Sequence, residues 1–363
     1  MSEDTKPIRQ GEELNEARLT EFLRENLGAK SDEISISQFP AGSSNLTYCV
    51  KIGDEEYVLR RPPFGNQVKT AHDMSREFNV LSKLSEVYSP APKPLIYCDD
   101  ETVIGSEFYL MERRRGLIIR GKLPALSEPP ALAGGSTLEN SSDLRRKVCE
   151  SFIENLARLH ALDYKKIGLE NLGKPEGYAT RQVEGWTNRY FKAKTDEHAG
   201  LEKAIEWLNA NIPASGGAAL VHNDYKFDNV MLDPENLTEI VAVLDWEMAT
   251  VGEPLMDLGT TLGYWMSREA GDEMLSMPFN PRVLMENISR RELVEMYAEK
   301  SGRDTSGILF YYVFGTFKIA VIAQQIYFRF ARGFTQDKRF ATFDRFVGAL
   351  GEIALHAIKT EKI

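Results

Sequence analysis

The sequence predicts an α+β protein of two lobes, in which a small antiparallel sheet precedes a large helical part. Up to residue 112, short segments rich in β-branched and aromatic residues alternate with tight turns, which favours an antiparallel meander. From residue 143 onward, long segments carry apolar residues at helical spacing. We therefore expect a first lobe over residues 1–112 that covers a nucleotide and a helical second lobe over residues 113–363.

The first lobe is predicted to be a sheet with helices packed against it. A helix is expected over residues 14–27, where leucine and phenylalanine recur at helical spacing. Three strands should follow, with turn residues between them, at 33–40, 46–53 and 55–63. An amphipathic helix over 70–87 and two further strands, at 95–100 and 107–114, complete the lobe.

The second lobe is predicted to be helical around a few short central strands. It opens with a stretch rich in Pro, Gly and Ser over residues 120–142, which indicates a long loop. A strong helical pattern then begins with Asp143 as the expected N-cap. Further helices are expected at 177–194, 200–212, 255–269, 289–301, 306–331 and 339–359, and strands at 219–224, 229–233 and 239–247.

Composition and charge exclude several classes of protein. The net charge of −10 argues against nucleic acid as a partner, because phosphate backbones require clustered Lys and Arg. The cysteines Cys49, Cys98 and Cys149 are far apart without a CxxC pair, so neither a disulfide framework nor a structural zinc site is expected. The start of the chain is polar and acidic, and no apolar run approaches the roughly 18 residues of a membrane helix. We expect a cytoplasmic protein without a membrane partner and leave its oligomeric state open.

A cluster of polar residues in the segment VHNDYKFDNVMLD indicates phosphoryl transfer from ATP. Asp224 and Asn229 are five residues apart, which is the spacing of kinase catalytic loops, so Asp224 would face an acceptor hydroxyl and Asn229 a metal. Lys226 could meet the transferring phosphate. Asp245 ends the apolar run IVAVLD and would be a second ligand of Mg²⁺, which prefers hard oxygen ligands.

Other interpretations of the cluster remain open. Asp and Asn are common in turns for conformational reasons, and Asp228 serves equally well to shape the turn. His222 is interpreted as a structural hydrogen-bonding residue beneath the loop, although a metal hydrolase using His222, Asp224 and Asp228 is a further possibility. A protein kinase is disfavoured, because Asp245 and Asp257 are only 12 positions apart and leave no room for an activation loop.

The segments HNDYKFDNVMLD and VLDWEMATVGEPLMDLG resemble the aminoglycoside phosphotransferase and choline kinase-like family of small-molecule kinases. The segments YVLRRPP and LARLHALD look most like the kinase-like domains joined to acyl-CoA dehydrogenases, and the resemblance covers about residues 35 to 330. It implies a bilobal protein-kinase-like fold that phosphorylates a hydroxyl of a small molecule. The acceptor would be a hydroxylated acyl compound, an amino alcohol or an aminoglycoside-like molecule.

The resemblance also implies roles for individual residues. Asp224 matches the catalytic base, and Asn229 and Asp245 match the metal ligands. The nucleotide-covering loop would contain Gly42, Ser43, Ser44 and Asn45, and the hinge that offers backbone groups to adenine would contain Met111 and Arg113. Asp257 matches a buried carboxylate that holds the catalytic loop.

One position departs from the family pattern. Arg60 stands on the third strand where much of the family has Lys, and it would pair with Glu77 and the nucleotide phosphates. Arg61 or Lys51 could take over this task. The departure keeps open a catalytically weak or dead nucleotide-binding protein of the same fold. Four aromatic residues of the second lobe could line the acceptor pocket or belong to the core: Trp186, Tyr190, Tyr264 and Trp265.

Overall fold

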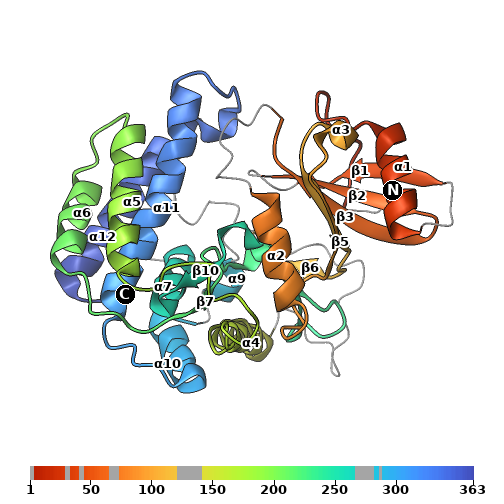
Figure 1. The fold of residues 1–363 in the computed structure, drawn as a ribbon. Helices are drawn as coiled ribbons and strands as arrows, with labels where there is room; N and C mark the ends of the chain where they lie inside the picture. The colour runs from red at the N-terminus through yellow and green to blue at the C-terminus, as the bar shows by residue number, and fades with distance from the viewer. Residues whose placement is uncertain are drawn as a thin grey trace. The chain divides into compact units, whose positions relative to one another are not determined.

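A computed structural model describes residues 4–28, 33–40, 45–64, 73–120, 141–265, 282–285 and 288–363. The chain divides into two compact units (Figure 1). The first contains Met1–Arg115 and Val241–Glu247, and the second contains Gly116–Ile240 and Met248–Ile363. The predicted fold class is confirmed, since a small antiparallel sheet is followed by a large helical part. The first unit extends three residues beyond the expected boundary and gains the segment with Asp245, which was expected in the second lobe.

The first unit is built on one antiparallel sheet. Its strands are β1 (Ile34–Gln38), β2 (Leu46–Ile52), β3 (Glu55–Arg61), β4 (Pro94–Cys98) and β5 (Phe108–Glu112). They lie in the order β1-β2-β3-β5-β4, and every neighbouring pair is antiparallel. Helix α1 (Glu16–Leu27) buries Leu19 and Leu23 in an apolar cluster with Tyr48 and Phe108 of the sheet. A short helix, α3 (Glu101–Ile104), lies between β4 and β5 and was not predicted.

Helix α2 (Met74–Leu84) packs against β4 and β5 (Figure 1). Asp73 caps its N-terminus, because the Asp73 carboxylate accepts a hydrogen bond of 2.9 Å from the N–H of Arg76. The same helical face buries Val80 and Leu81 and also carries Glu77 into the interior. The amphipathic pattern of the sequence therefore places one carboxylate on an otherwise apolar face.

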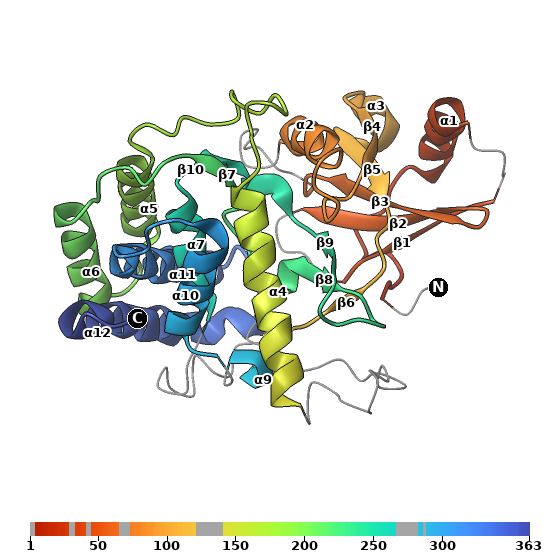
Figure 2. The same cartoon turned by 90° about the horizontal axis from the view of Figure 1, so that it is seen from below.

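The second unit consists mainly of helices. They are α4 (Ser142–His160), α5 (Tyr178–Ala193), α6 (Ala199–Ala210), α7 (Pro254–Tyr264), α9 (Arg282–Met285), α10 (Arg290–Ser301), α11 (Ile308–Ala331) and α12 (Phe343–Thr360). Helices α5, α6, α11 and α12 lie side by side (Figures 1 and 2). Ser141, and not the predicted Asp143, caps α4, because its hydroxyl accepts from the N–H of Leu144 at 3.2 Å.

Short strands hold the loop that the sequence singled out. Strand β7 (Ala219–Val221) pairs with β10 (Thr250–Gly252), and β8 (Val230–Leu232) pairs with β6 (Leu117–Ile118); both pairs are antiparallel. Strand β9 (Ile240–Val243) continues from the second unit into the first. The polar cluster thus begins where β7 ends and finishes in a 3₁₀ turn, Phe227–Asn229, that leads directly into β8.

Helices α7 and α11 approach each other backbone to backbone. A Cβ atom placed on Gly259 of α7 would lie 2.1 Å from the main-chain oxygen of Tyr311, and one on Gly315 of α11 would lie 2.0 Å from the main-chain oxygen of Gly259. Such distances leave no space for even a methyl group. We call this contact the α7–α11 seam. It fixes the separation of two helices that both supply side chains to the loop that contains Asp224.

Helix α11 is long and apolar enough to cross a membrane by length and composition alone. Of its apolar window, 78% is buried inside the structure, which is typical of a core helix. The expectation that no apolar run approaches this length was therefore wrong for α11, although the helix serves as a core element here. All three cysteines are free and buried.

Candidate active site

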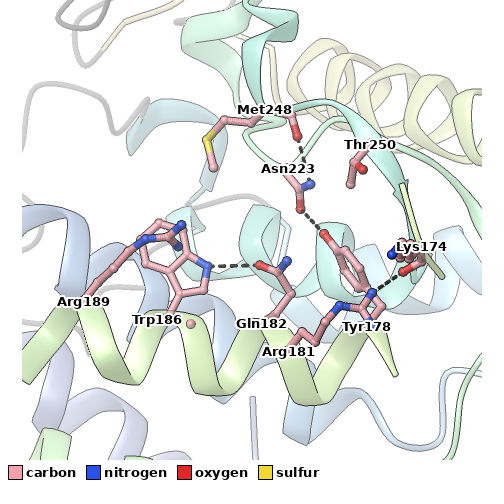
Figure 3. A pocket seen from close by; sticks show the side chains of 10 residues that line it. Lys174, Tyr178, Arg181, Gln182, Trp186, Arg189, Asn223, Met248 and Thr250 are labelled. Carbon is pink, nitrogen blue, oxygen red and sulfur yellow. Dashed lines mark hydrogen bonds between the residues drawn. The ribbon is translucent and has the colours of Figure 1, made fainter. Parts of the chain in front are cut away.

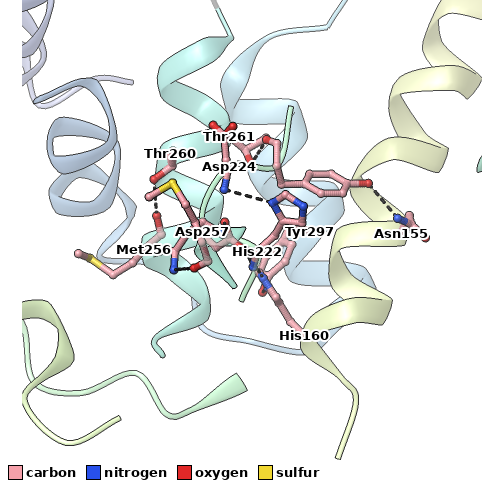
Figure 4. Close-up of polar contacts among 12 residues, drawn as sticks. Asn155, His160, His222, Asp224, Met256, Asp257, Thr260, Thr261 and Tyr297 are labelled. Carbon is pink, nitrogen blue, oxygen red and sulfur yellow. Dashed lines mark hydrogen bonds and ion pairs between the residues drawn. The ribbon is translucent and has the colours of Figure 1, made fainter. Parts of the chain in front are cut away.

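One buried carboxylate holds the loop that precedes Asp224 in the second unit (Figure 4). Asp257, on α7, accepts hydrogen bonds from the N–H groups of His222 at 2.7 Å and Asn223 at 2.8 Å. Its side chain is fully buried. Burial acts to raise the pKa of Asp257, but hydrogen bonds from His160 and the loop hold the pKa below its usual value. The carboxylate therefore stays charged and clamps two consecutive peptide groups.

His160 supports this carboxylate from α4. Its Nε2 atom lies 3.2 Å from Asp257, and its Nδ1 atom lies 2.7 Å from the hydroxyl of Tyr297. Burial lowers the pKa of His160, so the imidazole is neutral, with Nε2–H donating to Asp257 and Nδ1 accepting from Tyr297. His222 is also fully buried and accepts from the N–H of Asp224 at 3.3 Å. This position agrees with the structural role that the sequence suggested for His222.

The carboxylate of Asp224 receives three donors. Lys226 Nζ lies 2.8 Å from its Oδ2 atom, and the hydroxyl of Tyr264 lies 3.1 Å from its Oδ1 atom. The side-chain amide of Asn229 donates to Oδ2 at 3.0 Å and to the main-chain oxygen of Asp224 at 2.9 Å. Three residues predicted as functional, Asp224, Lys226 and Asn229, are thus in direct contact.

The carboxylate of Asp224 shifts the pKa values of two of its donors, Lys226 and Tyr264. Burial opposes the charge of Lys226, yet the neighbouring Asp224 carboxylate raises the pKa of Lys226 above its usual value. Burial and the same carboxylate raise the pKa of Tyr264, so its hydroxyl remains a donor. Tyr264 was considered only as a pocket residue in the sequence. Its position at the end of α7, seven residues after Asp257, was the available signal.

Asn223 adopts a left-handed backbone conformation, with φ of 66°. Among non-glycine residues, Asn tolerates this region best, and such backbone geometry is common at functional loops. Its side-chain oxygen accepts from Tyr178 at 3.1 Å, and its amide donates to the main-chain oxygen of Met248 at 3.1 Å. The loop therefore turns sharply just before Asp224 and is fixed on both sides.

A lysine that the sequence analysis missed holds the other side of this turn. Lys318, on α11, donates to the main-chain oxygen of Asn223 at 2.5 Å and lies 5.6 Å from the ring centre of Trp186. Burial lowers the pKa of Lys318 to about 8. The signal in the sequence was a single Lys inside the apolar stretch of α11, 94 positions after Asp224.

A second cluster, in the first unit, surrounds Arg60. Its guanidinium donates to Glu77 at 2.7 Å and to Asp245 at 2.9 Å, and it lies 3.9 Å from Glu247. The Arg60 side chain is only 9% exposed. Burial acts to lower the pKa of Arg60, but these carboxylates hold it well above its usual value. Arg60 and Glu77 thus form the ion pair that the family resemblance implied.

Neither alternative cation takes the place of Arg60. Arg61 donates to the main-chain oxygens of Pro62 and Ile104, at 3.0 Å and 2.8 Å, and stacks on Phe64. Lys51 is exposed on β2. The third-strand cation of the described structure is therefore Arg60.

Asp245 and its neighbours are tied to this cluster through the main chain. Asp245 has a φ of 68°, and the next N–H, of Trp246, donates to Glu77 at 3.2 Å. Asn45, from the predicted nucleotide loop, donates to Glu247 at 2.7 Å. Glu247 was not singled out in the sequence, although it lies two residues after Asp245. The remaining predicted loop residues Gly42, Ser43 and Ser44 lie outside the described residues.

The predicted adenine hinge lies at the end of β5. Met111 is 7% exposed and is paired with Val58 of β3 and Pro94 of β4. The Arg113 guanidinium contacts Asp4 at 2.6 Å and also pairs with Glu56. These contacts are made by the Arg113 side chain. The predicted role, in which main-chain groups of Met111 and Arg113 bind adenine, stays a prediction.

The carboxylate oxygens of the first unit are of the kind that suits a hard divalent cation such as Mg²⁺. Glu77, Asp245 and Glu247 surround the guanidinium of Arg60, and Arg76 donates to the main-chain oxygen of Glu247 at 3.2 Å. Within the described ranges, no group of three or more His, Cys, Asp or Glu gathers around one point as a dedicated metal cage. A metal here would therefore be completed by nucleotide phosphates and water.

Of the four aromatic residues proposed for an acceptor pocket, Trp186 lines a cavity, and the other three are not among the described residues that line it. Trp186 lines a cavity of the second unit together with Tyr178 and Asn223 (Figure 3). Tyr264 contacts Asp224 instead. Tyr190 is fully buried, and Trp265 is buried with its indole N–H donating to the main-chain oxygen of Ile288 at 2.9 Å.

Comparison with protein families identifies the family of this chain. The family model described as "Phosphotransferase enzyme family" matches residues 35–279, which include both clusters. The chain belongs to this phosphotransferase family. Among curated proteins, it is 34% identical over 355 residues to human acyl-CoA dehydrogenase family member 11 and 32% identical over 339 residues to mouse acyl-CoA dehydrogenase family member 10.

These alignments cover 95% and 91% of this phosphotransferase-family chain, but only 42% and 30% of the relatives. The chain therefore spans about two-fifths or less of the length of the curated relatives that it matches.

Solved structures show the same fold. A putative aminoglycoside phosphotransferase from Ralstonia eutropha has a TM-score of 0.78 and 27% identity, with 96% of this chain and 99% of that chain covered. A choline kinase from Cryptosporidium parvum has a TM-score of 0.57 and 14% identity, with 93% and 98% covered. A thermostable aminoglycoside phosphotransferase mutant, in a ternary complex with AMP-PNP and hygromycin B, has a TM-score of 0.58 and 14% identity, with 93% and 98% covered. The phosphotransferase family thus accounts for both the sequence and the fold.

Proposed function

We propose that this chain transfers the terminal phosphoryl group of ATP, in the presence of Mg²⁺, to a hydroxyl group of a small molecule. The observation that carries the proposal is the carboxylate of Asp224. It contacts Lys226 and stands on a loop whose peptide groups are clamped by Asp257 and Lys318. Phosphoryl transfer depends mainly on positioning and on charge stabilisation, and this loop provides both.

In the proposed reaction, Asp224 accepts the proton of the acceptor hydroxyl while the hydroxyl oxygen forms a bond to the terminal phosphorus. The bond between that phosphorus and the bridging oxygen breaks, and ADP leaves with this oxygen. Lys226 supplies a positive charge next to Asp224. This charge would stabilise the negative charge of the phosphoryl group as it is transferred to the acceptor oxygen. Tyr264 and Asn229 orient the carboxylate so that one oxygen can meet the acceptor.

The Arg60 cluster would serve the nucleotide. Arg60 is a forked cation suited to phosphate oxygens, and Glu77 orients it. Asp245 and Asn229 would hold Mg²⁺, which neutralises phosphate charge when it is bound. The aminoglycoside phosphotransferase structures in complexes with AMP-PNP or ADP support the use of a nucleotide.

The relatives leave the acceptor open between two chemical classes. The acyl-CoA dehydrogenase names support a hydroxylated acyl compound, whereas the choline kinase and the aminoglycoside phosphotransferases support an amino alcohol or an aminoglycoside. Each of these molecules offers a hydroxyl, so the proposed chemistry is the same for both.

A panel of hydroxyl compounds, with ADP release as the readout, tests the function. Asp224→Asn should lower kcat by about 10²- to 10⁴-fold, as expected for the loss of a general base, with little change in ATP binding. Asp304→Asn, which makes the same change at an exposed turn, is the matched control and should retain wild-type turnover. Binding of Mg²⁺-ATP without turnover of any acceptor would favour a nucleotide-binding protein that has lost catalysis.

A further inference from the structure

A cavity of about 420 Å³ lies in the second unit beside the catalytic loop (Figure 3). Its floor is α5, which supplies Tyr178, Trp186 and Arg189, and Tyr178 points toward Asn223. This volume is in the usual range for sites of small molecules. Asn223 lines the cavity and directly precedes Asp224, the proposed base, so the cavity borders the loop that carries this base.

The wall of this cavity is positively charged. Lys174, Arg181 and Arg189 line it, and no acidic side chain does so among its described lining residues. The chain as a whole carries a net charge of −10, so a patch of three cations without a carboxylate runs against its overall composition. Local excess charge in a concave site raises the concentration of ligands of opposite charge.

Arg189 is the cation most clearly prepared for an anion. Its guanidinium carbon lies 4.5 Å from the ring centre of Trp186, so the indole face fixes the plane of the fork. Within the described part of the chain, no carboxylate forms an ion pair with it. The residue is exposed, and partial burial of its guanidinium lowers the pKa of Arg189. An anionic ligand would provide the missing partner.

Arg181 keeps its charge available in a different way. Its guanidinium donates to the main-chain oxygens of Lys174 and Glu176. These acceptors orient the side chain but carry no charge. Arg181 and Lys174 therefore form a second positive wall, at the opposite end of α5 from Arg189 as the cavity is viewed in Figure 3.

The cavity is linked to the catalytic loop by direct contacts. Tyr178 donates to the side chain of Asn223, and Trp186 lies above the ammonium of Lys318, which holds the main-chain oxygen of Asn223. A ligand that packs against Tyr178 and Trp186 is thus held by the same residues that position Asp224.

From this geometry, and resting on the function proposed above, we propose that the acceptor is an anionic hydroxyl compound. Its carboxylate or phosphate group would bind Arg189, with Lys174 and Arg181 adding positive charge, while its hydroxyl faces Asp224. This assignment separates the chain from the amine-bearing acceptors named for its structural neighbours, because a cationic group would meet three like charges.

Calorimetric titration at saturating Mg²⁺-AMP-PNP, which keeps the nucleotide site filled, tests the proposal. The probes are 3-hydroxybutyrate and glycerol 2-phosphate as the two anionic sources, butane-1,3-diol and glycerol as their uncharged counterparts, and choline as the cation. The variants are Arg189→Gln, the charge-conserving Arg189→Lys, and Lys192→Gln, which removes a charge from the same helix at an exposed position outside the cavity.

We expect at least one anionic probe to bind more tightly than its uncharged counterpart and more tightly than choline, and to bind more weakly as NaCl is raised. Arg189→Gln should weaken that binding by roughly 10- to 100-fold, as for a lost charge-assisted contact. Arg189→Lys should restore part of it, and Lys192→Gln should match the wild type. The comparison of carboxylate with phosphate identifies the group that is recognised.

Tighter binding of choline or of the uncharged probes, unchanged affinity in Arg189→Gln, or no binding of either anion would overturn the inference. The phosphotransferase proposal would survive each of these results as long as Mg²⁺-ATP binds and some hydroxyl compound is turned over. It would fail separately if neither occurred.

Discussion

Lys318 donates its buried ammonium group to the main-chain oxygen of Asn223, at 2.5 Å, and so connects helix α11 to the peptide that precedes Asp224. Together with the Asp257 carboxylate, which accepts from two N–H groups of the same loop, it fixes the loop from opposite sides. Lys318 binds a main-chain oxygen of the loop, and Asp257 binds two main-chain N–H groups. Neither contact involves the side chain of Asp224.

The first prediction concerns the pH dependence of stability due to Lys318. Its pKa is lowered to about 8 in the folded state, from 10.5 for an ordinary lysine side chain. Between these values the unfolded chain binds a proton that the folded chain does not, so this contribution to the free energy of unfolding rises with pH. The stability gained at high pH is lost again as the pH falls from 10.5 to 8. Urea unfolding from pH 7 to 10 should show this increment in the wild type, on the order of 2 kcal/mol between pH 8 and 10.

Lys318→Met should lack the increment, and the difference between the two proteins should therefore change with pH. The exposed Lys51 offers a matched variant, Lys51→Met, which should retain the increment because it leaves Lys318 in place. A constant difference for Lys318→Met would mean that its ammonium is not desolvated as described.

The second prediction concerns Asp257. Asp257→Asn leaves one acceptor oxygen for two loop N–H groups and removes a buried charge that His160 also contacts. The free energy of unfolding should fall by about 2–4 kcal/mol, and kcat should fall while KM for ATP changes little, because the loop and not the nucleotide cluster is affected. Chemical denaturation and steady-state kinetics provide the two readouts. An equal rise in KM for ATP would place Asp257 in nucleotide binding instead.

The third prediction concerns Arg60 and Glu77 as one unit. Their ion pair is nearly completely buried. Removing Arg60 leaves the buried carboxylate of Glu77 without its cation, and removing Glu77 leaves Arg60 without the residue that orients it, although Asp245 still pairs with Arg60. Arg60→Gln and Glu77→Gln should each lower kcat/KM for ATP, and the double variant should be little worse than the more damaging single variant. Arg60→Lys would restore the residue that much of the family has at this position. Strictly additive losses would assign the phosphate-binding task to another cation.

The fourth prediction separates metal-dependent nucleotide binding from an inert fold. A ligand whose concentration is 100 times its Kd stabilises the folded state by about 2.7 kcal/mol. In a chain of this size, this should raise Tm by roughly several degrees. Mg²⁺-ATP should give this shift, and ATP with a chelator should give much less. Asp245→Ala should lose most of the Mg²⁺-dependent part, whereas Asp224→Asn should keep it. A full shift in Asp245→Ala would place the metal elsewhere.

The site residues that could be predicted from the sequence are those that lie close together along the chain. Asp224, Lys226 and Asn229 lie within six positions, so a single loop brings them together whatever the surrounding fold does. The strands of the first unit were also predictable, because β-branched residues and turn signals alternate there over short distances.

The residues that escaped prediction reach the site from distant elements. Lys318 and Tyr264 are 94 and 40 positions from Asp224, and their direction is decided by how α7 and α11 pack. The N-cap of α4 was placed two residues late, since Ser141 and Asp143 are equally good caps by residue type. The structure groups Asp245 with the first unit, whereas the sequence placed it in the second lobe, because strand order along the chain does not reveal which unit a strand packs against.

The α7–α11 seam has a consequence for how such a chain could be adapted to a new acceptor. Gly259 and Gly315 bring the two backbones into contact, and Asp257, Tyr264 and Lys318 project from those same backbones. Any side chain added at the seam would displace all three groups at once. The charged wall of the acceptor cavity, by contrast, belongs largely to α5, whose Arg181 and Arg189 are exposed. Random mutagenesis should therefore find variation in substrate preference on α5, while the seam remains intolerant of replacement, so that selectivity can diverge without loss of the chemistry.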